Sequence, residues 1–234
     1  MNVLACDTST AILHLALCIF DDQQNISWFE SISLTAGNRH SELLMDRIIS
    51  LCADASIEVS DLDLLVAAKG PGSFTGLRIA MATLKGISCA ANIPLVGVMS
   101  LDAWYHAIDF ADRPTLVVID AKKQRFYSAL YERGERLVGP ADLRLEQIKE
   151  LIDHYPTLLV SGSDAPLLAK RLDKNLTIAH GKGSALALSL ARLGVKQYLS
   201  QGVDSDEAGP LYIRVSDAEL ALLKRTQSLE ERDD

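Results

Sequence analysis

Short apolar runs alternate with longer stretches of helical periodicity along most of this chain. Apolar runs bounded by turn residues are typical of buried strands, and apolar positions recurring every three or four residues indicate amphipathic helices. In the first half the pattern predicts strands over 2–6, 12–20, 26–34, 64–68 and 94–98, and helices over 38–55 and 76–91. In the second half it predicts strands over 116–120, 125–132, 157–161 and 176–179, and helices over 145–155, 165–172 and 184–199. An α/β fold follows from this order.

The two halves of the chain open on the same plan. In each half a strand ends at an aspartate, the chain turns, and a second strand returns, first around Asp7 and then around Asp120. We therefore predict one lobe over residues 1–100 and a second lobe over 101–220. The charged tail over 221–234 reads as a solvated, frayed end, and we assign it no role.

The composition is that of a folded globular protein. Of 234 residues, 48% are hydrophobic, which is enough for a sizeable core. No apolar run approaches the roughly 20 residues that cross a bilayer, and the N-terminus has neither a basic region nor a long apolar segment. We therefore expect a cytoplasmic protein without a membrane partner.

The charge balance limits which partners the chain can hold by itself. A formal net charge of −8 and a pI near 5.1 argue against tight binding of a polyanion by this chain alone, because basic groups supply most affinity for nucleic acid. If RNA is involved, we expect a partner to hold it. Lys122, Lys123 and Arg125 form the most basic local cluster, which faces RNA, an acidic partner or only solvent.

No cysteine or histidine pattern predicts a metal site. Cys6, Cys18, Cys52 and Cys89 are widely separated in apolar contexts, so buried reduced thiols are expected. The five histidines include no pair with the close helical spacing of a zinc site. We predict no bound metal.

One glycine-rich segment is more informative than any acid or base. Between the strand over 64–68 and the helix over 76–91 lie Gly70, Gly72 and Ser73, and a strand, glycine turn and helix start can cradle an anion. The segment lacks the Lys-Ser or Lys-Thr pair of a nucleotide-binding P-loop. The alternative is a tight connection that packs closely against its neighbours.

The full run Gly-Pro-Gly-Ser-Phe-Thr-Gly-Leu-Arg-Ile from residue 70 to residue 79 resembles the signature of the TsaB (YeaZ) family. That family supplies the partner subunit in bacterial threonylcarbamoyladenosine modification of tRNA. Weaker likenesses at similar spacing extend over the whole chain, at residues 4–10, 39–44, 93–98, 100–101, 120–121, 127 and 210–214. The resemblance implies two ribonuclease-H-like lobes of the actin, Hsp70 and sugar-kinase superfold.

In that superfold the first hairpin turn commonly carries a glycine that lets backbone amides approach phosphate. Here Ser9 stands at that position, and the second turn, after Asp120, has no glycine. The loops that would lie near a nucleotide are Asp7, Thr8, Ser9, Thr10, Gly70, Gly72 and Ser73. We expect no cofactor bound tightly by this chain, although the resemblance allows ATP and Mg²⁺ to bind in the assembled complex. The alternative is that the polar side chains at residues 7–10 only satisfy turn amides.

The resemblance also implies that this chain is not the catalytic subunit. The related TsaD family carries a His-x-x-x-His metal motif on the corresponding helix, whereas this chain has His40 followed by Leu44. Ser73 does not stand in a Gly-x-Ser-x-Gly elbow, so a peptidase gains no support. We predict no catalytic residues.

Two helices are the predicted partner surface. The resemblance implies that they form a helical bundle with a TsaD-like chain, or a homodimer when the protein is alone. The predicted interface residues are His40, Leu44, Ile48, Leu51, Cys52, Ala82, Thr83, Gly86 and Ala90. The alternative is that both helices only cover their own sheet.

We therefore predict a non-catalytic subunit that pairs with a TsaD-like catalytic protein and works with a TsaE-like ATPase. The assembled system would transfer threonylcarbamoyl to adenosine 37 of tRNAs reading ANN codons, with tRNA bound only through the complex. The alternative is an ATP-dependent kinase or ATPase of the same superfold that uses Asp7 and Asp120 with Mg²⁺. A homodimeric regulatory module is a third possibility.

Overall fold

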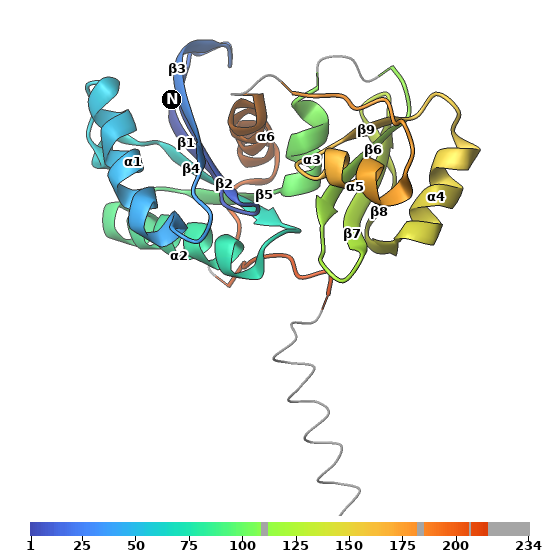
Figure 1. Cartoon of the computed structure of the whole chain (residues 1–234). Coiled ribbons are helices and arrows are strands. Elements are labelled where there is room, and N and C mark those ends of the chain that lie inside the picture. The colour runs from blue at the N-terminus through green and yellow to red at the C-terminus, as the bar shows by residue number, and fades with distance from the viewer. Residues whose placement is uncertain (109–111, 182–184, 206, 215–234) are drawn as a thin grey trace, which may run out of the picture.

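The computed structural model describes residues 1–108, 112–181, 185–205 and 207–214. The predicted tail over 221–234 lies outside the described residues. The described chain forms two lobes, each built around its own sheet, with helices packed on both faces of each sheet (Figure 1). None of the described helices is long and apolar enough to cross a membrane.

The first sheet has the strand order β3-β2-β1-β4-β5. Its strands are β1 (Asn2–Asp7), β2 (Ile12–Phe20), β3 (Ile26–Thr35), β4 (Leu64–Gly70) and β5 (Leu95–Met99). The first three strands pair antiparallel, and β4 and β5 extend the sheet in parallel to β1. Strands β1 and β4 are central and are buried on both faces, which explains their nearly continuous apolar sequences.

Helices cover both faces of this first sheet. The helices are α1 (His40–Asp54) and α2 (Phe74–Ala91) on one face and α6 (Ala185–Gln201) on the other. The sequence pattern places α6 in the second half of the chain, yet its apolar side chains pack against those of β1 and β4 in the first lobe. An added Cβ at Gly194 of α6 would lie 2.4 Å from Val66 Cγ2, so this helix lies directly on the sheet. The lobe boundaries stay a prediction.

The second sheet has the order β8-β7-β6-β9. Its strands are β6 (Thr115–Asp120), β7 (Arg125–Glu132), β8 (Glu135–Arg144) and β9 (Leu159–Ser161). Helices α4 (Leu145–His154) and α5 (Ala165–Leu172) cover one face, and the short α3 (Ser100–His106) covers the other. Because α3 also packs against α6, it joins the second sheet to the first lobe.

Several elements differ from the sequence prediction. The pattern did not predict β8, because this exposed edge strand contains Gly139 and Pro140 and lacks a buried face. Nor did it predict α3 or the 3-10 helix η1 (Val59–Asp61), which are too short to show a period. The strand expected over 176–179 is reduced to one bridge between Val160 and Ile178.

Candidate functional site

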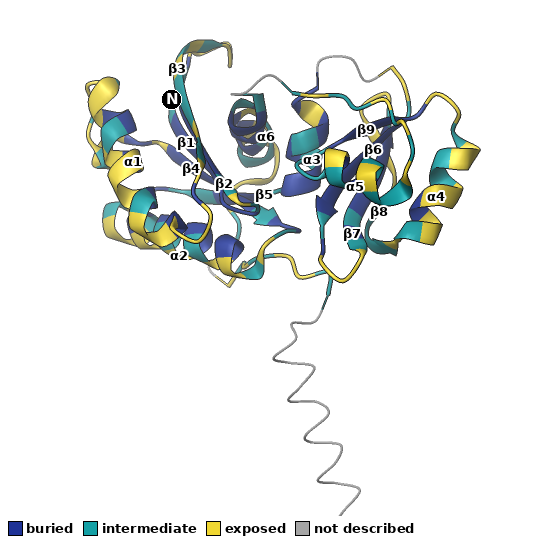
Figure 2. Ribbon diagram, viewed as in Figure 1, coloured by how far each residue is buried: buried dark blue, intermediate teal, exposed yellow. Residues whose placement is uncertain are grey.

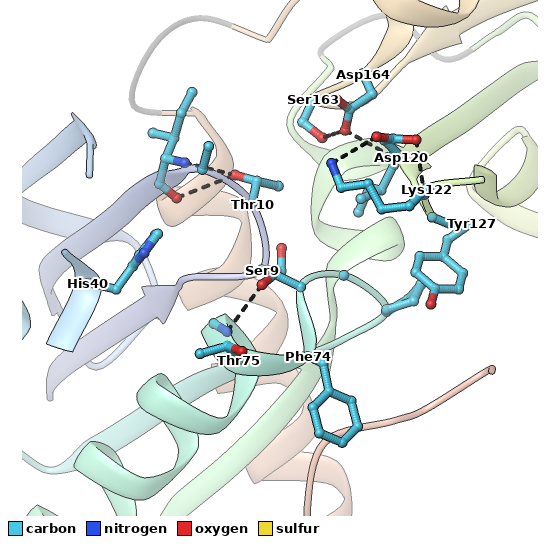
Figure 3. A pocket seen from close by; sticks show the side chains of 18 of the residues that line it. Ser9, Thr10, His40, Phe74, Thr75, Asp120, Lys122, Tyr127, Ser163 and Asp164 are labelled. Atoms are coloured by element: carbon cyan, nitrogen blue, oxygen red, sulfur yellow. Dashed lines mark hydrogen bonds and ion pairs between the residues drawn. The ribbon is translucent and has the colours of Figure 1, made fainter. Parts of the chain in front are cut away.

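A cleft of about 900 Å³ lies between the two lobes (Figure 3). Its walls come from the β1–β2 turn, the chain before α1, the glycine-rich segment before α2, the end of β6 and the C-terminal segment over 211–214. The structure therefore brings together the two aspartate turns that the sequence singled out. The arrangement of their side chains decides what the cleft can hold.

The polar side chains of the β1–β2 turn bond partly within the turn and partly to helix α2, while Asp7 Oδ2 and Ser9 Oγ have no hydrogen-bond partner among the described residues. Asp7 is buried, and its Oδ1 accepts a hydrogen bond from the Ser9 amide at 2.6 Å. Thr8 donates its hydroxyl proton to the Gly76 carbonyl oxygen at 2.7 Å, and Thr10 bonds to the backbone of Ile12. These contacts agree with the alternative in which short polar side chains stabilise the turn.

The glycines of the signature segment allow close packing against that turn. An added Cβ at Gly72 would lie 2.5 Å from the Cβ of Ser9, and one at Gly76 would lie 1.9 Å from the carbonyl oxygen of Thr8. The Ser73 amide donates to the Ser9 carbonyl oxygen at 2.6 Å. The glycine-rich segment therefore packs directly against the turn, and both segments line the cleft.

Ser73 caps helix α2. Its Oγ accepts a hydrogen bond from the Gly76 amide at 3.2 Å, so the helix begins at Phe74 rather than at the predicted residue 76. Gly70 has a φ of +102°, a backbone conformation that favours glycine. The segment thus combines a helix cap, a special backbone angle and close packing.

On the opposite wall, Asp120 is held in ion pairs. The Lys122 ammonium lies 2.9 Å from Asp120 Oδ2, and the Arg171 guanidinium lies 3.3 Å from Oδ1. Burial alone would raise the pKa of Asp120, but the hydrogen bonds and charge of Lys122 and the charge of Arg171 together hold that pKa below its usual value. Asp164 accepts a hydrogen bond from the Asp120 amide at 2.9 Å and so fixes the turn.

The C-terminal segment over 211–214 crosses the cleft from one lobe to the other. Tyr212 stacks on Phe74 with ring centroids 4.3 Å apart, and Arg78 Nε donates to its hydroxyl oxygen at 3.0 Å. Two residues later, Arg214 donates to the Ala121 carbonyl oxygen at 3.1 Å. Sequence reasoning missed the Phe74, Arg78 and Tyr212 cluster, because Tyr212 is remote in the chain and no local pattern joins it to α2.

Behind the first turn lies a small group of buried polar side chains. His14 Nδ1 lies 2.9 Å from Ser33 Oγ, and its ring meets Trp104 edge to face. Within the described residues, Asp7 Oδ2, His14 Nε2 and Trp104 Nε1 have no hydrogen-bond partner. Burial lowers the pKa of His14, and the nearby Asp7 carboxylate offsets only part of that effect. His14 therefore resists protonation in the folded protein.

This burial predicts a pH-dependent stability. Because the unfolded chain binds a proton at His14 with an ordinary pKa near 6.5 and the folded chain resists it, stability should fall as the pH drops through about 6.5. When the pH is lowered from 7.5 to 5.5, we expect the free energy of unfolding of His14→Gln to fall by about 1 kcal/mol less than that of the wild type. Urea unfolding of both proteins at the two pH values measures the difference. Equal losses in both proteins would contradict a neutral buried His14.

The predicted interface residues on α1 do not lie at the surface of this chain. His40, Leu44, Ile48, Leu51 and Cys52 are all buried, and the apolar members pack onto the first sheet. Figure 2 shows buried and exposed stretches alternating along α1. The physical reason is that their helical stripe faces the leucines of β2 rather than solvent. For α1, the alternative that the helix covers its own sheet describes these side chains correctly.

The outward faces of the two helices carry different residues. On α1, Met45 and Ile49 are 39% and 51% exposed. On α2, Ala82, Gly86 and Ala90 are exposed and Thr83 is half-buried, so these predicted interface residues remain available and their role stays a prediction. We call Met45, Ile49, Ala82, Gly86 and Ala90 the outer helix face. Helices α1 and α2 contact each other on the same side of the sheet.

No contact among the described residues requires a glycine at position 86. An added Cβ would meet nothing within 4 Å, and its φ lies outside the left-handed region. A glycine in the middle of a helix costs about 1 kcal/mol relative to alanine. Cys89, also expected to be buried, is exposed on this helix, while the other three cysteines are buried and all four are free.

In the part of the chain that the structure describes, no group of three or more His, Cys, Asp or Glu side chains could hold a metal ion. The expectation that the chain binds neither metal nor cofactor stays a prediction. The described residues form a wide cleft with a closely packed first turn and an ion-paired second aspartate, and α2 exposes small residues.

Comparison with known proteins gives a consistent family. Residues 34–182 match the family model described as TsaD: tRNA N6-adenosine threonylcarbamoyltransferase. The tRNA threonylcarbamoyladenosine biosynthesis protein TsaB of Bacillus subtilis is 28% identical over 229 residues, which cover 94% of this chain and 96% of that protein. An uncharacterized Mycobacterium leprae protein is 40% identical over 59% of this chain, but the match spans only 38% of that protein.

A solved structure from Pseudomonas aeruginosa supports the fold. It belongs to an uncharacterized protein with similarity to peptidase YeaZ, has a TM-score of 0.72 and 23% identity, and covers 91% of this chain and 99% of that one. The predicted two-lobed fold of the ribonuclease-H-like and actin-like superfold is confirmed.

Proposed function

Because this chain belongs to the TsaB (YeaZ) family of tRNA threonylcarbamoyladenosine biosynthesis proteins, we propose that it is the non-catalytic partner of a TsaD-like catalytic subunit. The assembled cytoplasmic system, with a TsaE-like ATPase, transfers threonylcarbamoyl to adenosine 37 of tRNAs that read ANN codons. The chain contributes a docking surface that stabilises and orients the catalytic subunit.

The observation that carries this proposal is the outer helix face. Exposed Met45 and Ile49 lie on one helix, and the small residues Ala82, Gly86 and Ala90 lie on the adjacent one. Small residues on α2 would let a partner helix approach its backbone closely, and the exposed large apolar side chains on α1 would supply buried area. A partner helix could pack closely against the backbone at Gly86. This would explain why the helix contains a glycine there, since no contact among the described residues requires one.

The geometry of the cleft supports a non-catalytic role. In a kinase or ATPase of this superfold, the turn after β1 must leave room for phosphate. Here Gly72 and Gly76 bring the α2 segment into contact with Ser9 and Thr8, and Asp120 is bound by two cations. An enzyme that used Asp120 to bind Mg²⁺ would have to displace Lys122 or Arg171 from this carboxylate. ATP and Mg²⁺ belong, on this proposal, to the assembled complex.

Reconstitution tests the proposal directly. We expect this chain alone to leave an unmodified tRNA transcript unchanged in the presence of threonylcarbamoyl-adenylate. The TsaD-like and TsaE-like proteins of the same organism should modify the transcript only when this chain is added. Mass spectrometry of nucleosides from digested tRNA measures the product. Modification at the same rate without this chain, or by this chain alone, would overturn the proposal.

A further inference from the structure

The turn between β6 and β7 holds three consecutive residues in a rarely used backbone conformation. Lys122, Lys123 and Gln124 have φ values of 61°, 52° and 59°, although none is a glycine. Side-chain-bearing residues in the left-handed region carry a conformational cost, and such costs concentrate at functional segments. The turn is fixed by the Lys122 amide, which donates to Asp120 Oδ1 at 3.1 Å, and by the Arg125 amide, which donates to the Lys122 carbonyl oxygen at 3.0 Å.

This conformation displays two lysines at the end of the hairpin. Lys122 and Lys123 are both exposed, and the side chain of Lys122 is 80% accessible. Exposed Arg144, at the junction of β8 and α4, lines a hollow of about 380 Å³ together with Lys123 and Arg125. We call Lys122, Lys123 and Arg144 the basic tip. It stands out in a chain whose net charge is −8.

Lys122 could leave its ion pair with Asp120 and bind an external anion. Its partner Asp120 also accepts hydrogen bonds from the Lys122 amide and from Arg171. If the Lys122 ammonium turned to an external anion, Asp120 would keep both of these partners. The Lys122 side chain is 80% exposed, whereas that of Asp120 is 7% exposed, so moving the ammonium to an external phosphate leaves the Asp120 carboxylate paired with the guanidinium of Arg171.

We propose that the basic tip contacts the phosphate backbone of the tRNA bound by the assembled complex. This inference rests on the proposed function, which supplies the RNA. Phosphate is the anion that clustered lysines and arginines recognise without base specificity. The tip also adjoins the cleft, because Arg214 of the C-terminal segment bonds to Ala121 beside it. The rest of this acidic chain repels RNA, so the tip provides a local contact and not an independent binding site.

Charge reversal at the tip tests the inference. Lys122→Glu/Lys123→Glu changes the charge by the same amount as the control Lys149→Glu/Lys170→Glu on the exposed faces of α4 and α5. Binding of an unmodified tRNA transcript to the complex with the TsaD-like subunit is measured by filter binding from 50 to 200 mM salt. For the tip variant, and not for the control, we expect about tenfold weaker binding at 50 mM salt. We also expect its slope of log affinity against log salt to be smaller in magnitude by about 1.5.

Light scattering of the protein mixtures, without RNA, separates this inference from the proposed function. If the wild-type chain forms no complex, the proposed function fails, and the inference that rests on it fails as well. If the tip variant forms the complex and binds tRNA like the control, the inference is overturned. If the tip variant loses the complex, while the control keeps it, the tip docks an acidic protein surface and the RNA assignment is also overturned.

Discussion

Gly76→Ala is expected to destabilise the protein by about 3 kcal/mol or more, at the upper end of overpacking effects. The new Cβ would lie 1.9 Å from the carbonyl oxygen of Thr8. Both sides of this contact are backbone, so no flexible side chain can move away, and the helix or the β1–β2 turn must shift. The shift would also disturb the hydrogen bond from Thr8 Oγ to the Gly76 carbonyl oxygen. Urea unfolding measures the loss.

Gly86→Ala is the matched control, because it makes the same substitution on the same helix. With open space around its Cβ, it should stabilise the isolated chain by about 0.5 to 1 kcal/mol. If Gly76→Ala unfolded at the urea midpoint of the wild type, the glycines of the signature would not be explained by close packing. The phosphate-cradle interpretation would then regain support.

Gly86→Arg is expected to weaken association with the TsaD-like subunit by about thirtyfold or more, the effect of losing a central interface contact. The long charged side chain would project from the outer helix face where two helices must approach closely. The same substitution should leave the isolated chain as stable as the wild type or more so, because arginine favours a helix more than glycine does. Isothermal titration measures the affinity, and urea unfolding the stability.

Two further variants make this prediction specific. Ile49→Glu, on the adjacent helix, should also lower the affinity, because it replaces an exposed apolar side chain of the proposed interface with a charge. Glu150→Arg, at an exposed position of α4, should change neither affinity nor stability appreciably. Unchanged affinity in both Gly86→Arg and Ile49→Glu would remove the outer helix face from the interface.

The regular elements of the first lobe were predictable because their physical signals are local. Strands β1 and β4 are buried on both faces, so their sequences are nearly continuously apolar. The stripe through Leu44, Ile48 and Leu51 marks an amphipathic helix equally clearly. That stripe does not reveal whether the helix faces its own sheet or a partner, since both surfaces are apolar. The structure assigns it to the sheet, and exposed Met45 and Ile49 take its place as candidates.

The site was less predictable, because its contacts join segments far apart in the chain. Glycines at 72 and 76 are compatible with a phosphate cradle and with close packing, and only the approach of Ser9 and Thr8 distinguishes the two. Tyr212 reaches Arg78 across most of the sequence. The turn at Lys122 and Lys123 contains no glycine, so the sequence gives no signal of its left-handed backbone.

Light-scattering chromatography of the wild-type chain mixed with the TsaD-like protein of the same organism tests the central claim most directly. The account predicts one peak with the summed mass of the two chains, formed without added ATP or metal and lost with Gly86→Arg. Two separate peaks at micromolar concentrations, together with ATP turnover by this chain alone that Asp7→Ala abolishes, would contradict the account and favour an enzyme.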